Sequence, residues 1–192
     1  KKFPFNEDDD IVLGPSKNAR WSYAASKLVD EFLGLAFHNQ HGLPVIIVRL
    51  FNTVGPRQVG HYGMVIPRFV EQAMTNSPIT VFGDGKQSRC FCNVEDTIEA
   101  LVRLTEKEEC IGEVFNIGSS NEISIEELAN LVKKITNSSS DIEFIPYQEA
   151  YSDGFEDMKR RIPDTKKIEQ FTGWKSTVSL EETINRVWSF LS

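Results

Sequence analysis

The chain has 192 residues, and its 21 Lys and Arg against 28 Asp and Glu give a formal net charge of −7. With 40% hydrophobic and 26% charged residues, the composition is that of a globular protein rather than a disordered or fibrous one. The acidic balance argues against nucleic acid as a partner, and no apolar run approaches the roughly 20 residues that a membrane span needs.

The start of the chain reads as a loop. There is no initiator Met, and two phenylalanines and a proline precede an acidic run over residues 7–10. Such a segment is typical of a solvated connection rather than of the beginning of a domain. We therefore expect the chain to be a fragment of a longer protein.

A long helix followed by a strand is the first strong pattern. After Pro15 and Ser16, apolar residues recur at threes and fours until Gly42, which predicts a helix that is apolar over most of its circumference. The branched run from Pro44 to Phe51 does not alternate with polar residues. A run of this kind indicates a strand of a parallel sheet that is covered on both faces.

The rest of the chain continues the alternation of helices and strands. We predict a helix over residues 64–76, strands over residues 79–82, 89–94 and 114–117, and a turn at residues 83–85. Asp96 can cap the helix that carries Ile98, Leu101 and Leu104. Ser124 with Glu127, and Ser179 with Glu182, match capping boxes that open two further helices, the later one ending near Leu191. The fold class is therefore α/β.

Tyr23 and Lys27 form the spacing with the most chemical meaning. Residues four apart on a helix face the same way, so the phenol and the ammonium can converge on one ligand. A phenol is a poor base at neutral pH unless a cation stabilises its phenolate, and Lys27 is placed to be that cation. The spacing alone is common on helices, so the surrounding sequence must decide whether it is catalytic.

Six segments in order resemble the extended short-chain dehydrogenases/reductases that act on nucleotide sugars. They cover nearly the whole chain, from Tyr23-x-x-x-Lys27 to Gly173-Trp174. After the first come Arg49-Leu50-Phe51-Asn52-Thr53-Val54-Gly55-Pro56-Arg57, Pro78-Ile79-Thr80-Val81-Phe82-Gly83-Asp84-Gly85, Arg89-Cys90-Phe91 with Val94-Glu95-Asp96, Phe115-Asn116-Ile117-Gly118, and, as the sixth, Arg161-Ile162-Pro163-Asp164 with Gly173-Trp174. No single segment is decisive, but their shared order is specific.

The resemblance implies roles for particular residues. Tyr23 would remove a proton from a sugar hydroxyl while hydride passes to NAD, and Lys27 would hold the nicotinamide ribose. Phe51 would contact the cofactor. Asn52 and Arg57 would bind the substrate near its diphosphate or hexose. The remaining substrate contacts would be the nucleobase strand residues Val81 and Phe82 and the diphosphate-binding arginines Arg89 and Arg161, whose bidentate geometry suits phosphate.

The resemblance also implies an organisation. Residues 1–56, joined by residues 90–118, would form the carboxyl-terminal part of a Rossmann-type parallel sheet that binds NAD. Residues 57–89 and 119–192 would form a smaller α/β domain for the sugar nucleotide. Relatives dimerise through the helix that bears the Tyr-Lys pair, so we expect the full-length protein to be a homodimer.

A glycine-rich turn for the cofactor pyrophosphate is not in the chain. No G-x-x-G-x-x-G stands between a strand and a helix, and we expect that turn, together with the family's catalytic Ser or Thr, upstream of Lys1. The fragment alone should therefore lack oxidoreductase activity. An independent nucleotide-sugar binding module is the non-enzymatic alternative, although binding alone does not require Tyr23 and Lys27.

The reaction is left open among three types. We favour 4-epimerisation of a nucleoside-diphosphate hexose of the UDP-glucose or UDP-galactose type, through a transient 4-keto sugar. A 4,6-dehydratase is the alternative, and its distinguishing residues would lie upstream. A UDP-glucuronate decarboxylase is less favoured, because such relatives tend to carry an arginine at the position of Met64, where it suits a carboxylate substrate.

The three cysteines indicate a reducing cellular compartment rather than a disulfide framework or a metal site. Cys90 and Cys92 fall on one expected strand, and the odd, sparse set fits neither a disulfide framework nor a zinc site. We therefore expect a reducing, cytoplasmic setting and no bound metal.

Overall fold

The computed structural model describes residues 3–18, 20–60, 64–150 and 158–192. The elements in chain order are α1 (Arg20–His41), β1 (Ile47–Leu50), β2 (Thr53–Val54), α2 (Val65–Met74), β3 (Ile79–Phe82), β4 (Ser88–Cys90), β5 (Cys92–Asn93), α3 (Val94–Thr105), the 3₁₀ turn η1 (Glu108–Cys110), β6 (Val114–Ile117), β7 (Glu122–Ser124), α4 (Ile125–Thr136), β8 (Ile142–Ile145), α5 (Tyr147–Ala150), β9 (Arg160–Arg161), α6 (Lys166–Thr172) and α7 (Leu180–Leu191). Helices and strands alternate through most of the chain, which confirms the α/β class.

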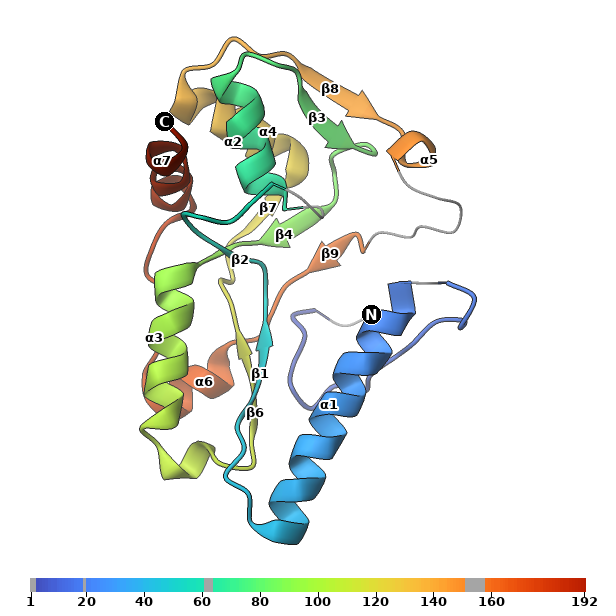
Figure 1. Cartoon of the computed structure of the whole chain (residues 1–192), viewed down its shortest axis with the longest axis vertical. Coiled ribbons are helices and arrows are strands. Elements are labelled where there is room, and N and C mark those ends of the chain that lie inside the picture. Colours follow the sequence, from blue (N-terminus) through green and yellow to red (C-terminus); the bar gives the residue numbers. More distant parts are fainter. Residues whose placement is uncertain (1–2, 19, 61–63, 151–157) are drawn as a thin grey trace.

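The lower part of the molecule is built on a parallel strand pair. β1 pairs in parallel with β6, with Ile47 opposite Val114 and Leu50 opposite Ile117. Helices α3 and α6 lie on one side of this pair, and α1 lies on the other side (Figure 1). Its core contains Phe115, Ile117 and residues from both flanking helices and the following loop: Ala100, Leu104, Ile168 and Trp174.

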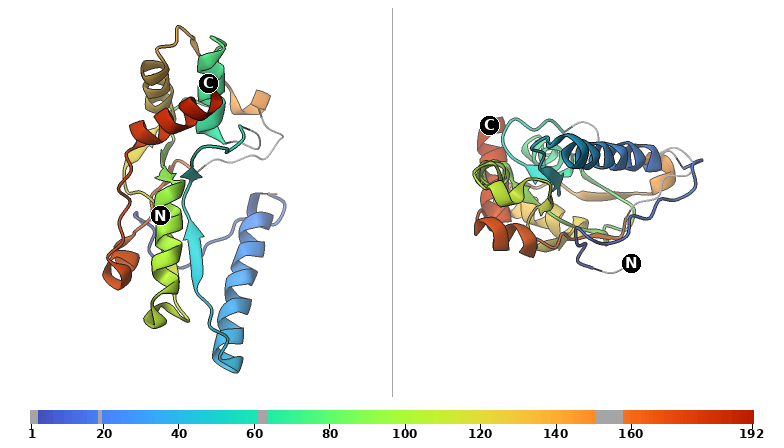
Figure 2. Two further views of the ribbon diagram at one scale, coloured as in Figure 1. Left: turned by 60° about the vertical axis from the view of Figure 1, so that its left-hand side comes forward. Right: turned by 90° about the horizontal axis from the view of Figure 1, so that it is seen from below.

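The upper part is a second layer of helices against short strands. Helices α2, α4 and α7 pack on one another beside the parallel pair β3 and β8 (Figures 1 and 2). Their buried apolar faces share one core, which includes Phe69, Val81, Leu128 and Ile184. The described residues thus form two cores. The lower one also takes in Ile168 and Trp174, which come from the last third of the chain.

A three-stranded sheet lies between the two parts. β4 is its central strand, antiparallel to β7 and parallel to β9. The strand predicted over residues 89–94 is divided into β4 and β5, because the chain leaves β7 and β9 at Phe91 and pairs β5 in parallel with β2. Because the strand is divided, residues 88–93 connect the upper part of the molecule to the lower part.

The predicted helix caps are partly right. Ser124 and Glu127 form the reciprocal capping box of α4. At α7, Ser179 accepts from the Glu182 backbone N–H, but the Glu182 carboxylate binds Arg186 instead. The prediction for Asp96 is wrong. Asn93 caps α3, and Asp96 is a buried residue of the first helical turn that binds the loop before α7.

The predicted burial of the first strand on both faces is also not met. Residues of β1 are partly exposed, and Leu50 is 44% exposed. The strand has β6 as its partner within the described part of the chain. A large cavity separates it from α1, and that cavity is the first feature of the candidate site.

Candidate active site

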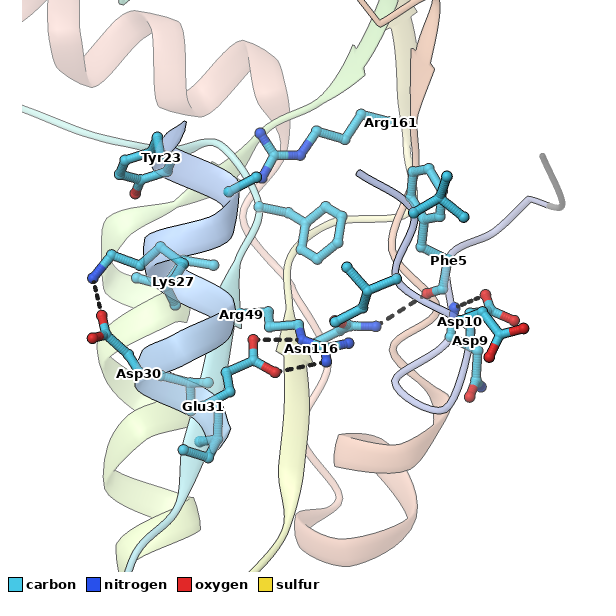
Figure 3. A pocket seen from close by; sticks show the side chains of 18 of the residues that line it. Phe5, Asp9, Asp10, Tyr23, Lys27, Asp30, Glu31, Arg49, Asn116 and Arg161 are labelled. Carbon is cyan, nitrogen blue, oxygen red and sulfur yellow. Dashed lines mark hydrogen bonds and ion pairs between the residues drawn. The ribbon is translucent and has the colours of Figure 1, made fainter. Parts of the chain in front are cut away.

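A cavity of about 1030 Å³ lies between α1, β1 and the amino-terminal segment (Figure 3). The apolar part of its wall includes Ile47, Val48 and Phe51, at and just beyond β1. Its polar part includes Tyr23, Lys27 and Arg161. The cavity therefore unites residues from the start, the middle and the end of the chain, and four of the predicted site residues are among them.

Tyr23 and Lys27 lie one helical turn apart on the same side of α1 (Figure 3). Both are open to solvent, with Tyr23 72% exposed. The Lys27 ammonium is 2.8 Å from an Asp30 carboxylate oxygen. The hydrogen bond and the charge of Asp30 raise the pKa of Lys27, and Tyr23 adds to the rise. Lys27 is thus a permanent cation beside the phenol.

Arg49 holds α1 against β1 below this pair. Its Nε and Nη2 donate to the two carboxylate oxygens of Glu31 at 2.9 and 2.7 Å. Its Nη1 donates to the backbone oxygen of Glu7 at 3.1 Å. Because the contact is bidentate and partly buried, it fixes the helix geometrically as well as electrostatically. One guanidinium joins three segments at the wall of the cavity.

Arg89 and Arg161 are neighbours across the parallel strands β4 and β9. The strand register pairs them directly, and adjacent strands lie only about 4.8 Å apart. Burial lowers the pKa of Arg161, and the charge of Arg89 lowers it further. No hydrogen bond or ion pair engages the Arg161 side chain within the described residues, although its guanidinium lies 5.1 Å from the Phe51 ring centroid. Two cations held together in this way favour an anion between them.

A smaller cavity of about 240 Å³ has Arg89 in its wall. Asn52, Phe82 and Arg89 line it, while the next-door Phe51 and Arg161 line the larger cavity. Arg89 also donates to the backbone oxygen of Met158, a residue of the larger cavity, at 2.7 Å. Two neighbouring arginines therefore line the two cavities, one in each wall.

Asn52 stands at the point where the chain passes from one cavity to the other. Its φ of 40° is left-handed, a conformation that asparagine tolerates better than most residues. Its Nδ2 donates to the Cys90 backbone oxygen at 2.8 Å, which ties the loop after β1 to β4. The loop turns at the carboxyl end of a parallel strand, where α/β proteins place their ligands.

Two predicted site residues lie apart from both cavities. Val81 is fully buried and packs in the upper core, because alternate residues of a strand face opposite ways and Phe82 takes the cavity side. A direct contact between the Val81 side chain and a ligand therefore does not fit the structure. Arg57 is exposed in a left-handed loop conformation, with φ of 71°, and is not part of either cavity wall.

Several residues of the site were not predicted from sequence. Arg68, Gln58 and Gln87 line the smaller cavity, and Glu31 and Arg49 set the helix at the larger one. A signal existed for Arg49, since an arginine inside an apolar strand needs a partner. For the glutamines no local pattern distinguishes a cavity-facing amide from a solvated one.

The described residues contain no group of three or more His, Cys, Asp or Glu side chains that could hold a metal ion. Burial raises the pKa of the Cys90 and Cys92 thiols to about 11, so neither is a thiolate at neutral pH. Within the described part of the chain, no helix is both long and apolar enough to span a bilayer.

Comparisons with known proteins give a consistent result. The profile of the family described as GDP-mannose 4,6 dehydratase matches residues 2–187. The UDP-N-acetyl-alpha-D-glucosaminuronate decarboxylase of Bacillus cytotoxicus is 44% identical over 180 residues, which are 93% of this chain and 56% of that protein. The UDP-glucuronic acid decarboxylase 1 of Arabidopsis thaliana is 38% identical over 190 residues, with coverage of 94% and 42%.

A solved structure is similar over the whole chain. It is a variant of the UDP-glucuronic acid 4-epimerase of Bacillus cereus in complex with UDP-4-deoxy-4-fluoro-glucuronic acid and NAD. The TM-score is 0.85 at 29% identity, covering 100% of this chain and 57% of that one. The chain spans about half the length of the curated relatives it matches.

Proposed function

Because the chain belongs to the GDP-mannose 4,6-dehydratase family, we propose that the whole protein is an NAD-dependent enzyme that oxidises C4 of a UDP-linked sugar. The observation that carries this proposal is the Arg89–Arg161 pair, in which Arg89 lines the smaller cavity and Arg161 lines the larger one. A diphosphate over these arginines directs the sugar toward Tyr23 in the larger cavity. The nucleoside then occupies the smaller one.

Part of an NAD site fits the wall of the larger cavity. Ile47, Val48 and Phe51 offer an apolar surface for a flat ring, and Tyr23 and Lys27 stand beside it as polar groups. No glycine-rich G-x-x-G-x-x-G turn occurs in the 192 residues, so we propose that the cofactor pyrophosphate is held by a segment outside this sequence. When bound, NAD supplies the hydride acceptor.

The chain's own residues supply proton transfer and orientation. Tyr23 removes the proton of the sugar O4 hydroxyl as the hydride leaves C4. Lys27, kept protonated by Asp30, stabilises the phenolate form of Tyr23 that acts as this base, and the proton transfer leaves a neutral phenol. Asn52 holds the ligand where the chain crosses between the cavities. Arg49 keeps α1 at a set distance from β1, so the phenol stays directed at the same point.

Decarboxylation of a UDP-linked uronic acid is the outcome that the relatives favour. Oxidation at C4 makes such a sugar a β-keto acid, which loses carbon dioxide and gains a proton at C5, and return of the hydride to C4 would then give the pentose. The support is the 44% identity to a glucosaminuronate decarboxylase over 93% of the chain. Arg68 lies one turn after Met64 on α2 and lines the same cavity, so a cation is present near that position.

4-Epimerisation is the second candidate. Met64, not an arginine, stands in the wall of the smaller cavity, where it accepts a contact from Gln58 Nε2 at 3.4 Å. A thioether does not neutralise a carboxylate. Return of the hydride to the opposite face of the keto sugar would then invert C4 without loss of carbon.

Product analysis distinguishes these reactions. We expect the full-length protein, incubated with UDP-glucuronic acid or its N-acetylglucosamine counterpart, to release carbon dioxide and give a UDP-pentose by NMR. A C4 epimer would select the second candidate. Absence of turnover on UDP-glucose and on both uronates, with NAD bound, would contradict the proposal.

The arginine pair has its own test in the full-length protein. Arg161→Gln removes a charge-assisted contact worth about 1.5–3 kcal/mol, so UDP should bind roughly tenfold to a hundredfold more weakly. Arg160→Gln is the matched control, because Arg160 is the preceding residue of β9 and pairs with Glu122 instead. Equal affinities of the Arg161 variant and the wild type in calorimetry would remove the arginines from the site.

We further propose that the full-length protein is a homodimer through α1. Val29, Leu33 and Phe37 recur every four residues on this helix, and each is more than half exposed. A stripe of this size on one helix favours a protein contact. Sedimentation of a Leu33→Glu variant tests it, since a dimer with an unchanged dissociation constant would exclude this face.

A further inference from the structure

Glu7 is a buried carboxylate that lies outside the predicted set of site residues. The residue is 6% exposed, and its Oε1 accepts from the Asn116 backbone N–H on β6 at 2.8 Å. Its Oε2 is buried as well and has no hydrogen-bond partner among the described residues, so the contact with Asn116 is what holds the side chain. A hydrogen bond from a backbone N–H to a carboxylate is short and strong. It therefore fixes the amino-terminal segment to β6.

The backbone oxygen of Glu7 is bound by a different part of the chain. Arg49 of β1 donates to it from Nη1 at 3.1 Å. The same guanidinium is held by the Glu31 carboxylate of α1, one helical turn after Lys27. Glu7 is therefore connected through one side chain to the helix that carries the phenol of Tyr23.

A second series of contacts leads from the buried carboxylate to β9. Asn116, its partner, also donates from Nδ2 to the Phe5 backbone oxygen at 3.0 Å (Figure 3). That oxygen accepts from the Asp164 backbone N–H at 2.7 Å, and the Phe5 N–H donates to the Ile162 oxygen at 2.8 Å. The amino-terminal segment is thus paired with the chain directly after Arg161.

We propose that Glu7 is a positioning residue, which holds Arg161 and Tyr23 at a fixed separation across the larger cavity that both of them line. This rests on the proposed function, in which Arg161 binds the diphosphate and Tyr23 removes the O4 proton. When the diphosphate is bound, the sugar hydroxyl must lie within hydrogen-bond reach of the phenol. A changed separation should therefore lower turnover rather than affinity.

The affinity for UDP should not depend on Glu7. The register of β4 and β9 sets Arg89 beside Arg161, whereas the contacts of Glu7 are with Arg49 on β1 and Asn116 on β6. A positioning role thus predicts a lower kcat with nearly unchanged UDP binding. A residue that only supports the fold would shift the urea unfolding midpoint and leave the kcat of the folded protein as it is.

Kinetics and UDP calorimetry on the folded, full-length protein test the proposal. Glu7→Asp keeps the charge but shortens the side chain by one methylene group, so Asn116 can be reached only if the segment moves. It should lower kcat by about tenfold to a hundredfold, the cost of misplacing reacting groups by about 1 Å, while the dissociation constant of UDP stays within about twofold of wild type. Glu7→Gln keeps the length and an acceptor oxygen, so its kcat should stay close to wild type.

Asp8→Asn is the matched control, because Asp8 is the next residue, is exposed, and donates to Asn6 Oδ1 from its backbone. Its kcat should equal that of wild type. A wild-type kcat in Glu7→Asp overturns the proposal, and so does a parallel loss of UDP affinity. An equal loss of kcat in Glu7→Gln overturns it too, because the charge and not the reach would then matter. If folded wild-type protein turns over neither UDP-glucose nor either uronate, the proposed function itself fails.

Discussion

Replacing Asp96 tests whether this residue is a clamp between distant segments rather than a helix cap. Asp96 is 2% exposed, and one of its oxygens accepts from the backbone N–H groups of Thr177 and Val178, both at 3.0 Å. The other oxygen accepts from the Thr177 hydroxyl at 2.9 Å. The carboxylate thus fastens the loop before α7 to the first turn of α3.

The expected cost of Asp96→Ala follows from those contacts. The substitution leaves two partly buried backbone donors without this charged acceptor, and water can reach the exposed Thr177, so the free energy of unfolding should fall by about 1.5–3 kcal/mol. Asp96→Asn keeps one acceptor oxygen, so it should cost less. Asn93→Ala removes the observed cap of α3 and also the buried hydrogen bond from Asn93 Nδ2 to the Thr183 hydroxyl at 3.0 Å, so it should cost about 2 kcal/mol.

Urea unfolding of the full-length protein, followed by tryptophan fluorescence, measures these differences. Trp174 is a suitable reporter, since it is buried and its Nε1 donates to the Asp96 backbone oxygen at 2.9 Å. Glu95→Gln is the control, because Glu95 is the preceding residue and forms an exposed pair with Arg186. If Asp96→Ala costs no more than Glu95→Gln, the clamp makes no contribution to stability.

Two further predictions concern catalysis and pH. In the full-length protein Tyr23→Phe should abolish most turnover while UDP-sugar affinity in calorimetry stays close to wild type, and unchanged turnover would remove Tyr23 from catalysis. Hydrogen bonds from Arg160, and then from Ser88, lower the pKa of Glu122 to about 2 from an ordinary value of 4.5. The stability that this carboxylate contributes is therefore present above pH 4.5 and is lost as the pH falls toward 2. The urea midpoint of wild type should therefore fall more steeply over that range than that of Glu122→Gln, and parallel curves would contradict the assignment.

The elements that were predicted well are those whose signal is local. The helix over residues 64–76 and the capping box of Ser124 and Glu127 depend on periodicity and on side chains within one turn, and the structure contains both. Asp96 was misplaced for the converse reason. An acidic residue near a helix start looks like a cap, and only the fold shows that Thr177 and Val178 occupy its oxygens.

In the candidate site, too, the residues with a local sequence signal were predicted and those set by the fold were not. Tyr23 and Lys27 were expected on one face because their spacing is local, and both line the larger cavity. Of the two adjacent strand residues Val81 and Phe82, only one can face a cavity, and periodicity alone does not say which. The upper core takes Val81, so the strand presents Phe82.

The arginine pair shows why register matters more than composition for this site. A count of charges between residues 57 and 89 finds only a small positive excess, which a solvated surface would also produce. β9 comes from a distant part of the chain, and its parallel register sets Arg161 beside Arg89. Had β9 paired one residue out of register, Arg160 would stand there instead. Arg160 binds Glu122, whereas Arg161 has no carboxylate partner among the described residues, so the observed register sets a second cation without a carboxylate partner beside Arg89.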